Sequence, residues 1–224
     1  MPALTREQMA WRAAQDIPDG AVVNLGLGMP VQVSNHLPEG RDIFLQSENG
    51  VIGVGPEAAD GGDANLVDAG SRRITLRPGA TIIESAASFA MIRGGHIDIT
   101  VLGAFEVAAN GDLANWNARI PDKGPLVGGA MDLAVGARAT WVIMEHCTRD
   151  GRPRLLERCS LPLTGRACVT RVFTDHAVVD VTPDGFLVRE VVSGCTHAQL
   201  VERTGAALTF APDCKDLLAP ELAG

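Results

Sequence analysis

The sequence has 224 residues, a length that fits one α/β domain or two small ones and that buries roughly 70% of the extended-chain surface on folding. Hydrophobic residues make up 46% of the chain and charged residues 21%, so a sizeable core can form without disulfides. The net charge of −8, the aromatic content of 4% and the absence of Tyr argue against nucleic-acid binding, because phosphate backbones bind basic surfaces and unpaired bases stack on exposed rings.

The first predicted elements are a helix and a strand. The capping-box pattern TREQ at 5–8 predicts a helix, which ends at the turn PDG at 18–20. The unbroken run AVVNL at 21–25 follows, and its β-branched residues predict a buried strand. Asn24 is the polar exception inside that run.

A glycine-rich turn comes next. Residues 26–30 (GLGMP) lead into a helix with Pro30 in its first turn. A strand, a flexible turn and a helix start in this order present backbone amides to an anion or to a developing oxyanion. Gly26 and Gly28 have no third glycine at dinucleotide spacing, so the turn does not match a Rossmann fingerprint.

The stretch DIFLQSENGVIGVG at 42–55 holds the main candidate for chemistry. Its apolar run stops abruptly at SENG, which predicts a buried strand that ends in a tight turn and presents the carboxylate of Glu48. Asn49 and Gly50 are of the two types that most readily adopt positive φ. Taken alone, a Glu before Asn-Gly is a polar turn residue. Open α/β sheets, however, place their sites at the carboxyl ends of strands, where Glu48 is predicted to lie.

The segment from 56 to 116 contains short predicted elements of several kinds. They are a polar loop at 56–65, short strands at 66–69 and 74–76, a turn at 77–79, a strand at 81–84, a helix that Ser85 caps and that runs through Ile92, a buried strand at 97–102 and a hairpin at the Asn-Gly pair 110–111.

The remaining sequence completes an alternating pattern. Gly128 and Gly129 open a helix and again place bare amides at its start. Because strands alternate with helices and hairpins intervene, we expect an α/β fold with a mixed, mostly parallel sheet in a single domain, 1–224. The later elements are a strand at 139–145, hairpin strands at 176–181 and 186–192, a last helix capped by Thr196, and a tail.

Standard catalytic, metal and targeting signals are missing. The sequence has no GxSxG elbow, no GxxxxGK[ST] loop and no HExxH helix. Glu145, His146 and Cys147 are neighbours on a predicted strand, so their side chains point to alternate faces and we interpret them as structural. The cysteines show no zinc or disulfide spacing, and neither a signal-peptide core nor a membrane-length apolar run is present. We therefore expect no metal, no membrane association and a cytoplasmic protein.

Several motifs, in their order along the chain, resemble the β subunit of family I CoA-transferases. They are NLGLGMP, SENG with its glycine-rich continuation, SFAMIRGGHIDITVLGAFEVAANGDLANW, GGAMDLAVGA, MEHCTRDG and LPLTGRACVTR. The resemblance runs from about Thr5 to about Thr209. It implies a three-layer α/β/α fold of the CoA-transferase type, no permanently bound cofactor, and a coenzyme A thioester as substrate.

The resemblance also implies a mechanism in which Glu48 is the catalytic residue. Its carboxylate would attack an acyl-CoA, and a glutamyl-CoA thioester would carry CoA to the acceptor acid in a ping-pong cycle. Oxyanion donors would be an amide of Gly128 or Gly129 and the side chain of Asn24. The pocket floor would be shaped by Gly26, Gly28, Asn49 and Gly50.

Substrates and a partner are implied as well. The stretch PLTGRACVTRVFTD favours transfer from succinyl-CoA, or another acyl-CoA, to 3-oxoadipate, with acetoacetate or another 3-oxoacid as the alternative acceptor. In the family the site lies between this subunit and a similarly folded α subunit, so we expect an α2β2 heterotetramer. An acyl-CoA hydrolase and a non-catalytic CoA-binding regulator are the other candidate classes. Arg72, Arg73 and Lys123 are candidates for the CoA phosphates, although we interpret them as solvated surface charge.

Overall fold

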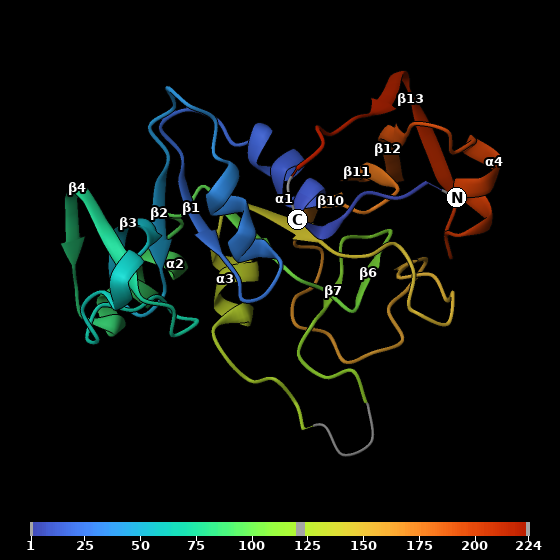
Figure 1. Ribbon diagram of the computed structural model, residues 1–224. Coiled ribbons are helices and arrows are strands. Elements are labelled where there is room, and N and C mark those ends of the chain that lie inside the picture. Colours follow the sequence, from blue (N-terminus) through green and yellow to red (C-terminus); the bar gives the residue numbers. More distant parts are fainter. Residues whose placement is uncertain (1, 120–123, 223–224) are drawn as a thin grey trace.

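In the computed structural model, which describes residues 2–119 and 124–222, a ten-stranded mixed sheet has the order β13-β12-β11-β10-β8-β5-β1-β2-β3-β4 (Figure 1). The central strands, from β10 to β2, pair in parallel, and antiparallel neighbours extend the sheet on both sides. The strands are β1 (Val22–Leu25), β2 (Phe44–Ser47), β3 (Val51–Glu57), β4 (Ile74–Ile82), β5 (Ile99–Leu102), β8 (Ala139–Ile143), β10 (Val169–Phe173), β11 (Ala177–Thr182), β12 (Gly185–Val192) and β13 (Leu208–Leu217).

Helices cover both faces of the central strands, which gives three layers. Helix α1 (Arg6–Gln15) packs with the 3-10 helix η1 (Pro30–His36), and Met9 belongs to one core cluster together with Val23 of β1. Helices α2 (Ser85–Arg93) and α3 (Ala130–Gly136) pack on each other and contribute to the second core cluster (Figure 1).

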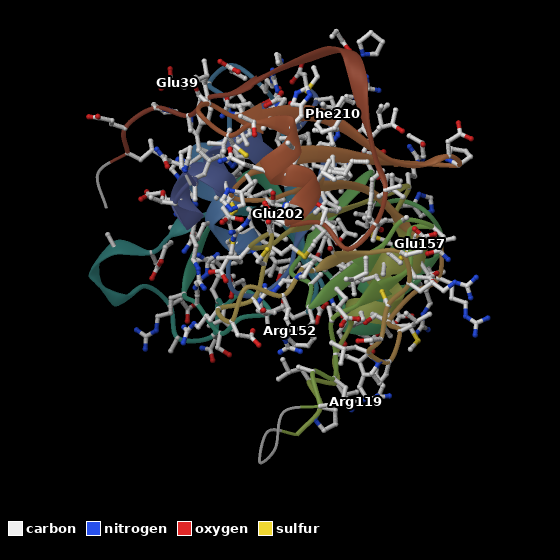
Figure 2. All side chains as sticks on the ribbon, turned by 90° about the vertical axis from the view of Figure 1, so that its right-hand side faces the viewer. Glu39, Arg119, Arg152, Glu157, Glu202 and Phe210 are labelled. Carbon is white, nitrogen blue, oxygen red and sulfur yellow. The ribbon has the colours of Figure 1, made fainter. Side chains whose placement is uncertain are left out.

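The remaining elements lie outside these layers. A three-stranded sheet in the order β7-β6-β9 is formed by β6 (Glu106–Ala108), β7 (Leu113–Ala114) and β9 (Leu155–Leu156). Helix α4 (His197–Glu202) connects β12 to β13, and its His197 ring stacks on Phe210, which Figure 2 shows beside α4. The 3-10 helix η2 (Ala59–Gly61) follows β3.

The central strands bring their carboxyl ends to one edge. Strands β5 (ITVL) and β8 (ATWVI) are almost wholly buried, as expected for parallel strands that are covered on both faces. Asn24 of β1 is in register with Gln46 of β2 on one side and Thr100 of β5 on the other. The segments that follow β1, β2 and β5 therefore leave the sheet side by side, at the edge where open α/β sheets bind ligands.

Several local predictions are confirmed. Thr5 and Thr196 close capping boxes at the starts of α1 and α4. The hairpin of β11 and β12 and the turn at the Asn-Gly pair between β6 and β7 form as expected. The turn at 26–30 leads into a helix with Pro30 in its first turn, although that helix is of the 3-10 type.

The predictions for residues 74–85 are wrong in two respects. The expected turn at 77–79 does not form, because β4 runs without interruption from Ile74 to Ile82. Pro78 is tolerated there because β4 is the edge of the sheet, where a missing N–H breaks no ladder hydrogen bond. Register shifts between β3 and β4 take up the irregularity. The helix that follows is capped by Glu84 rather than Ser85, and no side chain bonds to its cap.

Two strands form where no strand was predicted, and the first takes residues 56 and 57 from the predicted polar loop at 56–65. The glycine-spaced segment after Glu48 is β3, which pairs antiparallel with β2 and β4. The predicted C-terminal tail contains β13, which pairs in parallel with β12 at the other edge of the sheet. The short strand at 66–69 is reduced to a single bridge between Val67 and Arg73.

Candidate active site

Glu48 lies where the sequence predicted it, at the turn directly after β2. The Gly50 N–H donates to the Ser47 carbonyl (2.9 Å), and the Gly50 carbonyl accepts from Ile83 N–H (2.9 Å). Gly50 has φ of 118°, and a Cβ there would overlap the Ile83 carbonyl oxygen and lie 3.2 Å from its carbon. Only glycine fits this position, and it holds the turn that presents Glu48 against the segment entering α2.

The half-buried Glu48 side chain lines a cavity of about 450 Å³. The walls come from the ends of β1 and β5, the turn after β2 and the start of α3. Most of the lining is apolar, and its described residues include no Lys or Arg. They are residues 24–27, 47–48, 69, 102–105, 115, 126–130 and 133.

The carboxyl group of Glu48 packs directly on the α carbon of Gly129. A Cβ at Gly129 would lie 2.8 Å from Cδ of Glu48, 3.0 Å from Oε1 and closer still to Oε2. Gly129 is the N-cap of α3, and no side chain bonds to that cap. The first N–H groups of a helix have no intrahelical acceptor, so the start of α3 brings amide donors to the cavity beside the carboxylate.

Two causes raise the pKa of Glu48. The larger is burial, which disfavours the charged form, and the second is the carboxylate of Asp132 in the first turn of α3. Asp132 is itself paired with Arg93, the last residue of α2 (2.7 Å). A carboxylate with a raised pKa is a better nucleophile in its ionised form, which is the role that the family resemblance implies for Glu48.

Asn24 reaches the same cavity, but its amide is engaged. The amide nitrogen donates to the backbone carbonyl of Gln46 (3.1 Å) and to its side-chain oxygen (2.6 Å), and Gln46 in turn donates to the Ser88 hydroxyl (2.6 Å). This buried chain ties β1 to β2 and to α2. In this conformation Asn24 holds the strand that carries Glu48, and it can donate to a ligand only by leaving Gln46.

The predicted pocket residues divide into two groups. Gly26, Gly128 and Gly129 line the cavity with Glu48 and Asn24, although the Gly26 N–H is already bonded to the Val101 carbonyl (2.8 Å). The side chain of Asn49 instead donates to the Val67 carbonyl (2.8 Å) and anchors the neighbouring loop. The predicted residues outside the lining are Gly28, Asn49 and Gly50.

The candidates for binding CoA phosphates are engaged elsewhere. Arg72 pairs with the buried Asp68 (2.8 Å), and Arg73 donates to the Gly61 carbonyl. Lys123 lies outside the described residues. The interpretation of His146 as structural is confirmed, because its two ring nitrogens bond to the hydroxyls of Thr174 (3.0 Å) and Thr204 (2.9 Å). Burial lowers the pKa of His146 to about 3, so this imidazole stays neutral.

The sequence did not single out several residues of the site. Asp132 is part of the GGAMDL motif, but its proximity to Glu48 depends on how α3 packs against the rest of the fold. Gln46, Ser88 and Arg93 gave no signal, because each acts through tertiary contacts. Across the described ranges no helix is long and apolar enough to cross a membrane, and no cluster of three His, Cys, Asp or Glu side chains forms that suits a metal ion.

Comparison with known proteins identifies the family of the chain. The family model described as Coenzyme A transferase matches residues 6–203. The chain is 49% identical over 206 residues to the B subunit of the 3-oxoadipate CoA-transferase of Acinetobacter baylyi, covering 92% of this chain and 95% of that one. It is 48% identical over 203 residues to the B subunit of the probable succinyl-CoA:3-ketoacid coenzyme A transferase of Bacillus subtilis, covering 90% and 93%.

Solved structures agree on the fold. The acyl-CoA transferase YdiF of Escherichia coli O157:H7, as apoenzyme, superposes with a TM-score of 0.74 at 18% identity. The match covers 97% of this chain and 44% of that one, so the chain corresponds to slightly less than half of the longer protein. The fold, the family model and the relatives agree, and the chain therefore belongs to the coenzyme A transferase family, as a subunit of the B type.

Proposed function

We propose that this B-type chain carries the nucleophile of a CoA-transferase that moves CoA from succinyl-CoA, or another acyl-CoA, to a 3-oxo acid, with 3-oxoadipate as the first candidate. The observation that carries the proposal is the Glu48 carboxyl, which packs on Gly129 inside a 450 Å³ cavity at the carboxyl edge of the sheet. CoA enters as a thioester substrate, and no permanently bound cofactor is required.

The reaction begins when the Glu48 carboxylate attacks the thioester carbonyl of the acyl-CoA. The tetrahedral intermediate collapses, the C–S bond breaks, and free CoA thiolate leaves behind a mixed anhydride of Glu48 and the donor acid. The thiolate then attacks the glutamyl carbonyl and expels the donor carboxylate, so Glu48 holds CoA as a thioester. The acceptor acid reverses these steps. A carboxylate is needed because it acts first as nucleophile and then as acyl group, a role that Gln cannot take.

Each tetrahedral intermediate develops an oxyanion that needs fixed donors. Amides at Gly128 or Gly129 are the best placed, since they precede α3 beside the Glu48 carboxyl. One such donor is typically worth about 3 kcal/mol of transition-state stabilisation. Asn24 contributes in this scheme when its amide leaves Gln46 on substrate binding.

The choice of acceptor acid rests on two observations. One relative is named for 3-oxoadipate and another for a 3-ketoacid, at 49% and 48% identity, so identity alone does not separate them. The stretch PLTGRACVTRVFTD, which favours 3-oxoadipate, includes Thr164, whose hydroxyl donates to Asn115 (2.6 Å). Asn115 lines the cavity and donates to the Gly103 carbonyl (3.0 Å), so this stretch helps to shape the cavity wall.

The A subunit completes the enzyme in this proposal, as an α2β2 heterotetramer. Three residues of the cavity lining are apolar and largely exposed: Leu27 (64%), Leu126 (69%) and Val127 (82%). The described lining holds no cation for the distal carboxylate of 3-oxoadipate or for CoA phosphates. A partner at the cavity mouth would cover these exposed apolar residues and supply the missing cation. Cys147, Cys159, Cys168 and Cys214 form no disulfide, which suits a reducing compartment, and we place the enzyme in the cytoplasm.

Isotope exchange tests the proposed cycle. The complex with the A subunit is incubated with succinyl-CoA and isotope-labelled succinate without any acceptor acid. A ping-pong enzyme incorporates the label into succinyl-CoA, and Glu48→Gln abolishes this exchange. Absence of exchange in the wild-type complex contradicts the proposal. Continuous release of free CoA without acceptor identifies a hydrolase instead. For a transferase, the acceptor acid is then identified by comparing kcat/KM for 3-oxoadipate with kcat/KM for acetoacetate.

A further inference from the structure

Two carboxylates meet at the start of α3. Glu48 packs on the N-cap residue Gly129, and Asp132 is the third residue of the helix. Each is favoured by the positive end of the helix dipole, but like charges at one helix end oppose each other's ionisation. Among the described residues, the Asp132 carboxylate is the charged group that contributes, after burial, to the raised pKa of Glu48.

Arg93 reaches Asp132 from the neighbouring helix. It is the last residue of α2, and its guanidinium donates from Nε to Oδ1 (2.7 Å) and from the NH2 nitrogen to Oδ2 (3.2 Å) of Asp132. The pair therefore links the end of α2 to the start of α3, which carries Gly129. A cation in this position partly cancels the charge that Asp132 presents to Glu48.

Other charged groups near Glu48 lie outside the cavity lining. Glu84 is the exposed N-cap of α2, behind the Gly50 backbone. Asp68 lies behind Ser47 and is neutralised by Arg72. Among the described residues of the cavity lining, Glu48 is the only charged one. In the part of the chain that the structure describes, the Arg93 and Asp132 pair is thus the charge arrangement in the first turn of the helix on which Glu48 packs.

We propose that Asp132 and Arg93 are positioning residues that act through Glu48: Asp132 places a negative charge in the first turn of the helix whose N-cap Glu48 packs on, and Arg93 offsets that charge. This inference rests on the proposed function of Glu48 and names what regulates its reactivity. Basicity matters in both directions of the cycle, because a more basic carboxylate attacks the thioester faster but is protonated at a higher pH. Two charges of opposite sign let the enzyme balance these demands without placing either group in contact with substrate.

The chain offers a matched control. Arg138 and Asp98 form an ion pair at 2.8 Å with side-chain exposures of 67% and 32%, close to the 66% and 30% of Arg93 and Asp132. Neither Arg138 nor Asp98 lines the cavity. Arg138→Gln therefore removes an equivalent surface pair and one positive charge without touching the site. Arg93→Lys is the conservative variant that retains the charge.

The first measurement needs no enzymatic activity. A diazoacetamide reagent esterifies protonated carboxyl groups, so labelling of the 47–50 region in the complex, read by peptide mass spectrometry against pH, reports the protonated fraction of Glu48. Asp132→Asn should move the midpoint to lower pH and Arg93→Gln to higher pH. Arg93→Lys and Arg138→Gln should leave it near the wild-type value. Unchanged midpoints in both Asp132→Asn and Arg93→Gln overturn the inference.

The second measurement is the acid limb of kcat/KM for succinyl-CoA in the same complexes. At the wild-type midpoint half of Glu48 is ionised, so Asp132→Asn should be up to about twofold more active there and Arg93→Gln less active. If the labelling midpoints of the variants move but their acid limbs of kcat/KM coincide with that of the wild type, an effect on catalysis is contradicted. Failure of the proposed function shows up separately, as full transfer by Glu48→Gln, whatever the midpoints do.

Discussion

One α carbon limits where the Glu48 carboxyl lies. The missing side chain of Gly129 leaves the space that Cδ and Oε2 of Glu48 occupy. Gly128, the preceding residue, is open, and a Cβ there would meet nothing within 4 Å. Both residues would keep their amide N–H as Ala, so the two positions separate the packing of Glu48 from the supply of oxyanion donors.

Gly129→Ala should therefore strongly reduce the rate of CoA transfer, whereas Gly128→Ala should not. The added methyl group displaces the Glu48 carboxyl, and a misplacement of about 1 Å can cost on the order of 100-fold in rate. The measurement is kcat for both variants in the complex, with thermal melting to show that each is folded. Equal activity of the two variants would contradict the packing described for Glu48.

The position of Glu48 at the end of a buried strand could be predicted from sequence, because its signal is local. The SENG pattern indicates a turn after Glu48, and Gly50, though not Asn49, has the positive φ that this pattern favours. The role of Asp132 could not be predicted, because α3 must first dock beside β2 and α2. Asn24 shows the same limit, since the sequence marks it as polar but not as bonded to Gln46.

The elements differ in how strongly sequence determined them. Capping boxes and turns predicted α1, α4 and the β11–β12 hairpin, because those signals depend on neighbours in the chain. The two edge strands, β4 and β13, were missed in whole or in part. Their residues are mostly exposed on both faces, so no apolar alternation marks them. Pairing to a neighbour far along the chain decides their structure.

An ion-pair network ties α1 to the strands at the β13 side of the sheet. Glu190 of β12 is buried and accepts from Arg12 of α1 at 2.8 Å and 2.6 Å, and Lys215 lies 3.3 Å away. Burial alone would raise the pKa of Glu190. The bonds and charges of Arg12 and Lys215 outweigh burial and hold that pKa below its ordinary value of 4.5.

Glu190 should therefore make the fold sensitive to acid. A lowered pKa contributes stability that is present above pH 4.5 and lost as the pH falls through the folded-state value. The free energy of unfolding from urea titrations between about pH 6 and about pH 3 should fall less steeply for Glu190→Gln than for the wild type. The exposed Glu202→Gln is the control and should keep the wild-type slope. A wild-type slope in Glu190→Gln would be evidence against this role.

At the scale of the whole molecule, the chain is a B-type subunit, which implies an A-subunit partner. Three residues that line its cavity, Leu27, Leu126 and Val127, are apolar and largely exposed. Fold class and family were accessible from sequence, because many motifs recur in order over almost the whole length. The exposed apolar surface at the cavity was not, since exposure of Val127 and Leu126 follows only from the folded chain.

A charge at the cavity mouth should weaken the assembly. Val127→Glu places a carboxylate at a side chain that is 82% exposed here and that the A subunit covers in the proposed complex, so light scattering should show a weaker complex at equal concentration. Val201→Glu, at 46% exposure on α4, is the control. Figure 2 places its neighbour Glu202 on α4, well away from Arg119 on the loop that leads to α3. Equal weakening by both variants, or by neither, contradicts the proposed position of the partner.

The most direct measurement is of the covalent intermediate. The complex is incubated with succinyl-CoA, denatured, digested, and examined by mass spectrometry for CoA on the peptide that contains Ser47 to Gly50. The account predicts a CoA thioester on Glu48 that forms without acceptor acid, disappears when 3-oxoadipate is added, and is absent from Glu48→Gln. An adduct on another residue, or one that persists in Glu48→Gln, would contradict it.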